Sequence, residues 1–298
     1  MVVPDPRRQR TARRTLLGVV AALFVALLAY KILKAGHLEQ TALFYVGIPA
    51  LVALTVVATA RPRSALGTIM VAITIGLTLA GPLLDEGVIC LVVAAPLFYL
   101  CGAIVGGLAD WARHRRRGMH ALLIVPLLLL SAEGTAASLP RGGEVTATRT
   151  APAGTDLNLA LAAAPVFGPV RSPLLRLKFP KPVRAEGSGL DPGATRHIDF
   201  TPRRSLGIGA TPTPRSMDLT VIRHAPGLVV FAITRDTTLA RWLQLTEAEF
   251  RWEGSRLTVV LRYRRTFDPA WYFGPIQRYG MGEAAAYLAE TFTGRAAP

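Results

Sequence analysis

The most constraining feature of this sequence is the uneven distribution of its apolar residues. Of its 298 residues 51% are hydrophobic, and nearly all of the long apolar runs lie before residue 132. A run of about 20 apolar residues is long enough to cross the hydrocarbon core of a bilayer as a helix. After residue 132, charged residues, prolines and short alternating stretches prevail. The pattern predicts a helical transmembrane domain over residues 1–138 and a separate domain over residues 139–298.

Five apolar segments are candidates for membrane-spanning helices. They cover residues 15–34, 42–60, 65–84, 87–109 and 119–137. The first four have the length that a spanning helix needs, whereas the fifth is short and contains Pro126, so an interfacial position is the alternative for it. Gly102 and Gly106 have the spacing that lets two helices approach closely, and ordinary packing within the bundle is a simpler interpretation than specific dimerisation.

The basic residues of the first half cluster beside these segments. The formal net charge is +15, and arginines concentrate before residue 15, at residues 61–63 and at residues 113–117. These clusters fall on alternate connections, and basic connections stay in the cytoplasm. We therefore expect a multi-pass protein of the cell (inner) membrane, with a cytoplasmic N-terminus and an extracytoplasmic C-terminal domain. The charge favours the lipid bilayer rather than nucleic acid as partner.

The C-terminal half carries repeated strand signals. Strands are expected near 144–150, 183–188, 194–200, 205–210, 217–224, 227–234, 242–252 and 255–266. A brief helix is expected from Asp156 to Ala163, and the Pro-rich segment, residues 165–182, is expected to be a loop. Because no long helix separates the later strands, the spacing predicts an antiparallel meander.

The last strand and the helix after it are expected to face each other. One face of the strand is apolar and requires a cover; it consists of Leu257, Val259, Leu261 and Tyr263. We expect a final helix with Asp268 as its cap and with a break or restart at Gly274-Pro275. One stripe of this helix consists of Ile276, Gly280, Ala284, Leu288 and Phe292. Its small residues leave space for an apolar ligand, unless large aromatic side chains of the sheet fill that space.

Three segments of the chain resemble a known superfamily. Residues 262–266 with 268–275 are similar to the last strand and following helix of membrane-linked bacterial members of the SRPBCC (START/Bet v 1-like) superfamily, which includes the polyketide cyclase/dehydrase and lipid-transport group. Residues 186–189 with 194–196 are similar to the early hairpin of these proteins, and residues 85–90 to their membrane part. The resemblance covers about residues 144–292. It implies a helix-grip fold, an antiparallel sheet around a long C-terminal helix, with a cavity for a lipid or other hydrophobic small molecule.

The candidate cavity residues follow from the apolar faces. They are Arg196, Ile198, Phe200, Trp242, Phe250, Trp252, Leu257, Val259, Leu261, Tyr263, Trp271, Ile276, Gly280, Ala284 and Leu288. Arg196 shares a strand face with Ile198 and Phe200, so it is a candidate partner for an anionic head group at the cavity mouth. The alternative is an exposed arginine that lies over the sheet edge.

The sequence predicts no catalytic residue, metal site or cofactor. His197 and Asp199, like Glu247 and Glu249, alternate with apolar residues, which predicts that they face water. Serine-centred elbows, paired-histidine metal motifs and phosphate loops are absent from the sequence. We expect an extracytoplasmic, membrane-anchored helix-grip domain that binds or transports a hydrophobic molecule. A cyclase/dehydrase-like enzyme and a non-catalytic interaction module with a filled core are the alternatives, and the oligomeric state stays open.

Overall fold

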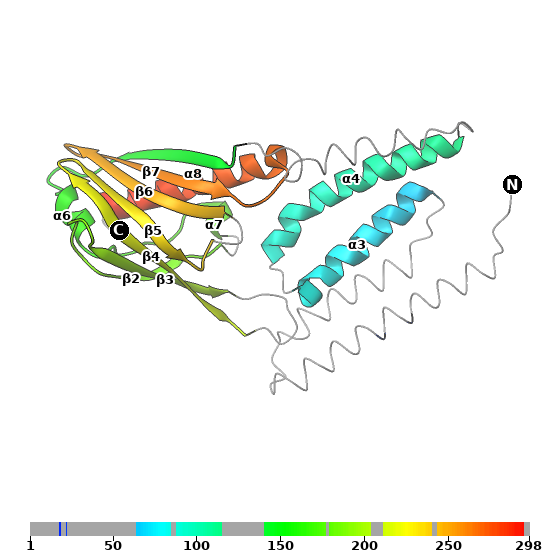
Figure 1. Cartoon of the computed structure of the whole chain (residues 1–298), viewed down its shortest axis with the longest axis horizontal. Helices are drawn as coiled ribbons and strands as arrows, with labels where there is room; N and C mark the ends of the chain where they lie inside the picture. Colours follow the sequence, from blue (N-terminus) through cyan, green and yellow to red (C-terminus); the bar gives the residue numbers. More distant parts are fainter. Residues whose placement is uncertain are drawn as a thin grey trace. The chain divides into compact units, whose positions relative to one another are not determined.

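A computed structural model describes residues 18, 22, 64–84, 88–114, 140–176, 179–203, 211–239 and 243–294. The chain divides into two units, and most of residues 130–298 form the second. In the first unit the described helices are α3 (Ala65–Leu84) and α4 (Val88–His114). The second unit contains a seven-stranded sheet and the helices α6, α7 and α8 (Figure 1).

Helices α3 and α4 pack against each other at two glycines. A Cβ atom placed on Gly106 would lie 2.5 Å from the Cα atom of Leu66, and one placed on Gly102 would overlap the side chain of Ile73. The prediction of close helix packing at these glycines is therefore confirmed. The carboxylate of Asp110 on α4 also accepts hydrogen bonds from the first two backbone N–H groups of α3, at 2.7 and 3.0 Å, which satisfies donors that a helix leaves without an internal partner.

Helix α3 has the bounds of the expected segment 65–84, and α4 covers nearly all of the expected segment 87–109 and continues to His114, so both segments are helical. Within the described residues, however, no helix is both long and apolar enough to cross a membrane. The expected bundle of five spans is thus not supported. The segments 15–34, 42–60 and 119–137 lie outside the described residues, apart from positions 18 and 22.

The second unit is built on one antiparallel sheet with the strand order β1-β7-β6-β5-β4-β3-β2. The strands are β1 (Gly142–Thr150), β2 (Pro182–Glu186), β3 (Thr195–Arg203), β4 (Thr213–Ala225), β5 (Leu228–Asp236), β6 (Leu243–Glu253) and β7 (Arg256–Arg265). The meander predicted for the later strands is confirmed, and β1 adds to its far edge by pairing with β7. The strand expected at 205–210 lies outside the described residues, which omit 204–210.

Two short helices connect β1 to β2. Helix α6 (Leu157–Ala162) begins after Asp156, whose carboxylate accepts a hydrogen bond of 3.0 Å from the backbone N–H of Leu159, as expected of a helix cap. Helix α7 (Pro173–Arg176) lies in the Pro-rich segment, where only a loop was expected.

The long C-terminal helix α8 (Ala270–Thr293) differs from the expectation at its start. Pro275 lies inside a continuous helix, so the predicted break at this position is wrong; a proline this early removes one helical hydrogen bond without ending the helix. The predicted cap is also wrong, because Pro269 occupies the cap position and no side chain caps the helix. Asp268 instead forms ion pairs with Arg141 at 2.7 Å and with Arg265 at 3.5 Å.

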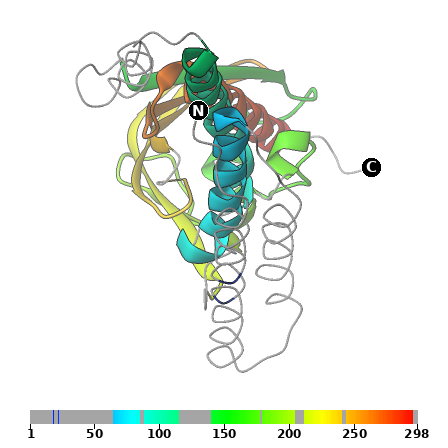
Figure 2. The ribbon, with the colours of Figure 1, turned by 90° about the vertical axis from the view of Figure 1, so that its right-hand side faces the viewer.

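The hydrophobic core lies between the sheet and α8, which contacts β1 and β7. The four residues predicted to form the apolar face of β7 are all buried, as are Met281, Ala285 and Ala289 on the helix. Fully burying a large apolar side chain contributes about 1.5–3 kcal/mol, so this face alone is a large stabilising term. The strands curve around the side of α8 (Figure 2), and the second unit therefore has a helix-grip arrangement, as predicted.

Candidate ligand-binding cavity

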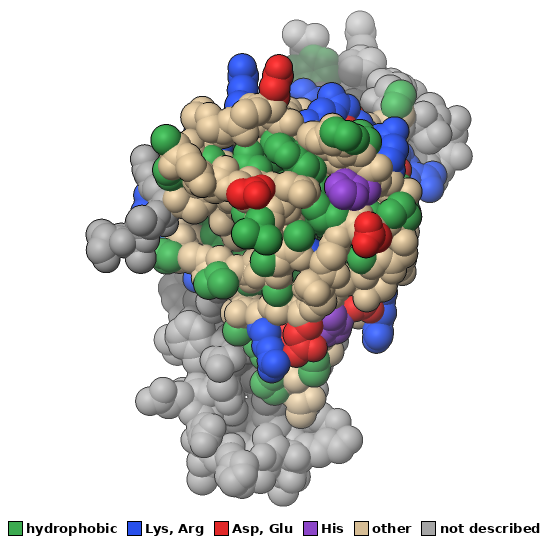
Figure 3. Space-filling view, turned by 90° about the vertical axis from the view of Figure 1, so that its left-hand side faces the viewer, with side chains coloured by type: hydrophobic (Ala, Val, Ile, Leu, Met, Phe, Trp, Pro, Cys, Tyr) green, Lys and Arg blue, Asp and Glu red, His purple; other side chains and the backbone are tan. Residues whose placement is uncertain are grey.

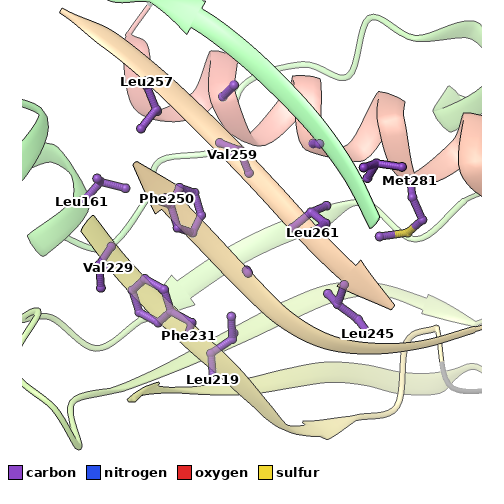
Figure 4. Close-up of a cluster of buried hydrophobic side chains, with 14 of the residues drawn as sticks. Leu161, Leu219, Val229, Phe231, Leu245, Phe250, Leu257, Val259, Leu261 and Met281 are labelled. Atoms are coloured by element: carbon purple, nitrogen blue, oxygen red, sulfur yellow. The ribbon is translucent and has the colours of Figure 1, made fainter. Parts of the chain in front are cut away.

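An apolar cavity of about 200 Å³ lies within the second unit. The sheet contributes Ile198, Phe200, Met217, Leu219, Phe231, Leu243, Leu245, Ala248, Phe250 and Leu261 to its wall. Helix α8 contributes Ile276, Gln277, Gly280, Met281, Ala284, Tyr287, Leu288 and Phe292. The Pro-rich segment contributes Pro165, Phe167, Val170, Leu175, Phe179, Pro180, Lys181 and Pro182. Figure 4 shows how side chains of the sheet and Met281 of α8 converge on the same interior.

The space exists because α8 presents small residues to the interior. All five members of the predicted stripe line the cavity, including Gly280 and Ala284 at its middle. A Cβ atom placed on Gly280 would meet its nearest neighbour, the side chain of Leu174, only at 3.7 Å. Two edge-to-face aromatic contacts join three large side chains of the wall: the ring centroids of Phe250 and Phe231 lie 5.8 Å apart, and those of Phe250 and Phe292 lie 5.2 Å apart.

The structure brings together nine of the candidate cavity residues. Arg196, Ile198, Phe200, Phe250, Leu261, Ile276, Gly280, Ala284 and Leu288 all line the cavity.

The other candidates lie elsewhere. Leu257, Val259 and Tyr263 are buried in the core, where β7 packs against α8. Trp252 is half-buried and packs against the same core. Trp271 lies on the first turn of α8 with 51% of its surface exposed. Trp242 lies outside the described residues. The alternating pattern thus identified the apolar face of β7 but not which part of that face borders open space.

The Pro-rich segment provides a part of the wall that was not predicted from the sequence. Phe167, Val170, Leu175 and Phe179 face the cavity from a region that was expected to be loop with little regular structure. The large apolar side chains between the prolines could have indicated that this segment is partly buried, since such side chains are more often buried than exposed. The hydroxyl group of Tyr287 on α8 fastens this segment by donating a hydrogen bond of 2.8 Å to the carbonyl oxygen of Gly168.

Arg196 is the only arginine that lines the cavity among the described residues, and it is 5% exposed. The alternative of an exposed position at the sheet edge is therefore wrong, and Arg196 lines the cavity as a buried side chain. Its Nη2 atom donates hydrogen bonds to three carbonyl oxygens, those of Leu161 at 3.0 Å, Ala162 at 2.8 Å and Gly189 at 3.1 Å. Its Nη1 atom has no hydrogen-bond partner among the described residues. Burial lowers the pKa of this guanidinium, because desolvation disfavours its charged form.

The carbonyl oxygens around Arg196 come from two tight local structures. Those of Leu161 and Ala162 end α6, where a helix leaves its last carbonyl groups without internal partners. That of Gly189 belongs to the turn between β2 and β3, in which Gly187, Gly189 and Gly193 all have positive φ angles. The N–H group of Gly189 in turn donates a hydrogen bond of 2.8 Å to the carbonyl oxygen of Ala162. The end of α6 and the hairpin turn therefore hold the guanidinium in place together.

The remaining polar groups of the wall are few. They are Lys181, Thr238, Gln277 and Tyr287, and among the described residues that line the cavity there is no aspartate, glutamate, histidine or cysteine. Burial raises the pKa of the Tyr287 hydroxyl. The cavity therefore presents hydrocarbon and hydrogen-bond donors, without a paired acid and base.

The carboxylates and imidazoles singled out in the sequence lie on the opposite face of the sheet. His197 contacts Asp218 through Nδ1 and Asp199 through Nε2, the latter at 3.3 Å, and all three side chains are partly exposed, as expected of a wet face (Figure 3 shows histidine and carboxylate side chains side by side on the surface). Glu249 differs, because only 1% of its side chain is exposed and it pairs with Arg251 and Arg262. No cluster of potential metal ligands occurs in the part of the chain that the structure describes.

No protein-family model matches this sequence, and no curated protein matches it. Several solved structures are similar to part of this chain. Ginseng major latex-like protein 151 from Panax ginseng is 9% identical, with a TM-score of 0.28 over 49% of this chain and 97% of the ginseng protein. A protein from Thermus thermophilus is 16% identical, with a TM-score of 0.29 over 51% of this chain and 94% of its own. The di-domain ARO/CYC StfQ from the steffimycin biosynthetic pathway is 10% identical, with a TM-score of 0.30 over 68% of this chain and 60% of StfQ. At these TM-scores the likenesses carry no inference about function.

Proposed function

We propose that the second unit binds a hydrophobic small molecule, such as a lipid chain, in the cavity between the sheet and α8. The observation that carries this proposal is the composition of the wall, which is aliphatic and aromatic over nearly all of its surface. An open apolar space leaves its lining side chains without packing partners, and filling it with hydrocarbon restores those contacts. Concave, mostly apolar sites with a few polar groups are typical of small-molecule binding. The helix-grip arrangement also agrees with the resemblance to the SRPBCC superfamily.

Neither alternative function is favoured by a specific observation. A cyclase/dehydrase-like reaction requires a base or acid at the substrate, and the described part of the wall offers lysine, arginine and tyrosine but no carboxylate or imidazole. An interaction module with a filled core would have no open space beside the small residues of α8, whereas Gly280 and Ala284 line a cavity. Ligand binding explains both the space and its apolar wall.

A pair of glycines on α8 allows a matched test of this proposal. Gly280 lines the cavity, whereas Gly282, on the same helix, does not line it and has no atom within 4 Å of a Cβ placed on it. Leucine at either position gains helix propensity to the same extent, somewhat less than the about 0.8–1 kcal/mol that separates glycine from alanine. Only at position 280 does its side chain enter the cavity.

The experiment titrates the purified full-length chain, stripped of bound lipid, with a panel of fluorescent fatty acids and neutral lipids. We expect saturable uptake by the wild type and by Gly282→Leu, and a loss of affinity of at least about tenfold in Gly280→Leu, since the new side chain occupies the binding volume. Absence of uptake across the whole panel would contradict the proposal, as would equal affinities of the two variants.

The membrane location is a separate proposal. Its support is the sequence pattern alone, the long apolar segments with basic residues on alternate connections, which predicts an extracytoplasmic second unit beside the bilayer. A bacterial alkaline phosphatase fused after Pro298 is active only outside the cytoplasm, so an active fusion is expected. An inactive fusion, with an active one at residue 63 or 115, would reverse the predicted orientation.

A further inference from the structure

We propose that the ligand is an amphipathic acid, a hydrocarbon chain with a carboxylate or similar oxyanion, and that the Nη1 atom of Arg196 binds the oxyanion inside the cavity. The inference rests on the proposed function and names the ligand class for the same site. It assigns to Arg196 the charged contact with the ligand in a wall that is mostly apolar.

The buried side chain of Arg196 has unused hydrogen-bonding capacity. Arg196 is 5% exposed and lines the cavity. Its Nη2 atom is shared by three carbonyl oxygens, whereas Nη1 has no partner among the described residues. A buried donor without a partner costs free energy, so native structures supply one from protein, water or ligand. Because the guanidinium borders the cavity, a ligand in the cavity can supply an acceptor to Nη1.

The positive charge of Arg196 favours an anionic ligand. The described ion pairs include none with Arg196, and the groups around its guanidinium are neutral: three carbonyl oxygens and the ring of Phe231, whose centroid lies 5.9 Å from Cζ. A buried charge is costly unless an opposite charge pairs with it. An anionic ligand offsets that cost, whereas a neutral alcohol satisfies the hydrogen bond but leaves the charge uncompensated.

The position of Arg196 on β3 indicates how an acid would lie in the cavity. Arg196 is held by the end of α6 and the turn at Gly189, at one end of β3, and Ile198 and Phe200 continue the same strand face as apolar wall. An oxyanion at Arg196 therefore leaves a hydrocarbon chain to run along apolar side chains. The described part of the wall offers no second buried arginine, and Lys181, the other cation that lines the cavity, is only partly buried.

The test compares a matched pair of ligands on the ligand-free full-length chain. Decanoic acid and 1-decanol have the same chain and differ in the charge of the head group at neutral pH. Isothermal titration calorimetry is expected to show that the wild type binds the acid at least about tenfold more tightly than the alcohol, as a charge-assisted hydrogen bond predicts. In Arg196→Met the acid is expected to lose that preference while the affinity for the alcohol is retained. Lys181→Met, the matched control, keeps the preference.

Each outcome decides a different question. Equal affinities of the wild type for acid and alcohol, as when a water molecule rather than a ligand satisfies Nη1, would overturn the inference and leave the proposed function intact. A preference that disappears in Lys181→Met would also overturn it. Binding of neither ligand, nor of any other apolar probe, would overturn the proposed function itself. Should Arg196→Met not fold, the wild-type comparison together with Lys181→Met still decides.

Discussion

The carboxylate of Glu249 on β6 accepts a hydrogen bond of 2.7 Å from Nη1 of Arg262 on the neighbouring strand β7. Arg251, two residues after Glu249 on β6, pairs with the same carboxylate. Both arginines reach over the face of the sheet that points away from the cavity. The side chain of Glu249 is almost completely buried beneath them, and Val230 and Val260, its partners on the adjacent strands, are buried as well.

This cluster predicts a dependence of stability on acid. Burial of the Glu249 carboxyl raises its pKa, but the hydrogen bonds and charges of Arg262 and Arg251 outweigh burial, and the net pKa lies below the ordinary value. A lowered pKa in the folded state contributes stability above the unfolded value, about 4.3, and this contribution is lost as the pH falls through the folded pKa. We therefore expect the free energy of unfolding to fall below about pH 4.3, and to fall less steeply in Glu249→Gln. Denaturant unfolding at a series of pH values measures both slopes, and identical slopes would contradict the assignment.

Removal of Arg262 tests the same pair from the other side. Arg262→Met keeps most of the apolar stem but leaves the buried carboxylate with Arg251 alone. Since a hydrogen bond to a charged group contributes about 1.5–3 kcal/mol, we expect a loss of about 2 kcal/mol in the free energy of unfolding at pH 7. Arg256→Met, at an exposed position of the same strand, is the control and is expected to change stability little.

The histidine on the outer face predicts the opposite dependence on pH. The hydrogen bond to Asp218 raises the pKa of His197 most strongly, burial opposes this rise in part, and the charge of Asp218 and the contacts with Asp199 raise the pKa further. A raised pKa contributes stability that is fully present below the unfolded value, about 6.5, and is lost as the pH rises through the folded pKa. Asp218→Asn is expected to lower the pKa of His197, as measured by hydrogen–deuterium exchange at its C2 carbon. An unchanged pKa of His197 in this variant would show that Asp218 does not stabilise the imidazolium.

The hydrogen bond between Tyr287 and Gly168 predicts how the Pro-rich segment is held. Tyr287→Phe removes only the hydroxyl group and keeps the ring that lines the cavity. An ordinary hydrogen bond contributes about 0.5–1.5 kcal/mol, so we expect a loss of about 1 kcal/mol in stability and faster tryptic cleavage at Arg171 and Arg176. Tyr279→Phe, on the exposed side of the same helix, is the control. Equal cleavage rates in the two variants would show that the contact does not hold the segment.

The parts of the second unit that the sequence predicts are those with a regular period. The alternation in β7 and the small-residue stripe of α8 follow from one period each, and both are seen in the structure. Local periodicity decides which side of an element is apolar. It does not decide where an apolar face borders a space, and so Leu257 was expected in the cavity but lies in the core.

The parts that the sequence does not predict depend on contacts between distant segments. Phe167 and Phe179 line the cavity in a segment that contacts α8 through the hydrogen bond from Tyr287 to Gly168 and the ion pair between Arg171 and Glu290, and no local period predicts such contacts. Glu249 alternates like an exposed residue, but two long arginine side chains cover it. Arg196 is buried because α6 supplies carbonyl oxygens from about 35 residues earlier in the chain, counting from Leu161.

The turn before β3 gives the last prediction, because it places one of the carbonyl groups that hold Arg196. Gly187 has a φ angle of +97°, and a Cβ atom placed on it would overlap the carbonyl oxygen of Thr195. Gly193 has nearly the same φ angle, +94°, but no atom lies within 4 Å of a Cβ placed there. Gly193→Ala therefore adds only the cost of a left-handed backbone, about 1–2 kcal/mol, whereas Gly187→Ala adds a clash with a backbone atom that cannot move away.

We expect Gly187→Ala to lower the free energy of unfolding by at least about 1 kcal/mol more than Gly193→Ala does. Because Gly189 lies two residues after Gly187 in the same turn, we expect a shift of the turn that relieves the clash to displace its carbonyl group from Nη2 of Arg196. Denaturant unfolding of the two variants at one pH measures the difference, and the titration with decanoic acid shows whether the displacement reaches the guanidinium. Equal losses of stability would mean that the hairpin relaxes around the added methyl group, and the turn would then not be what fixes the position of Arg196.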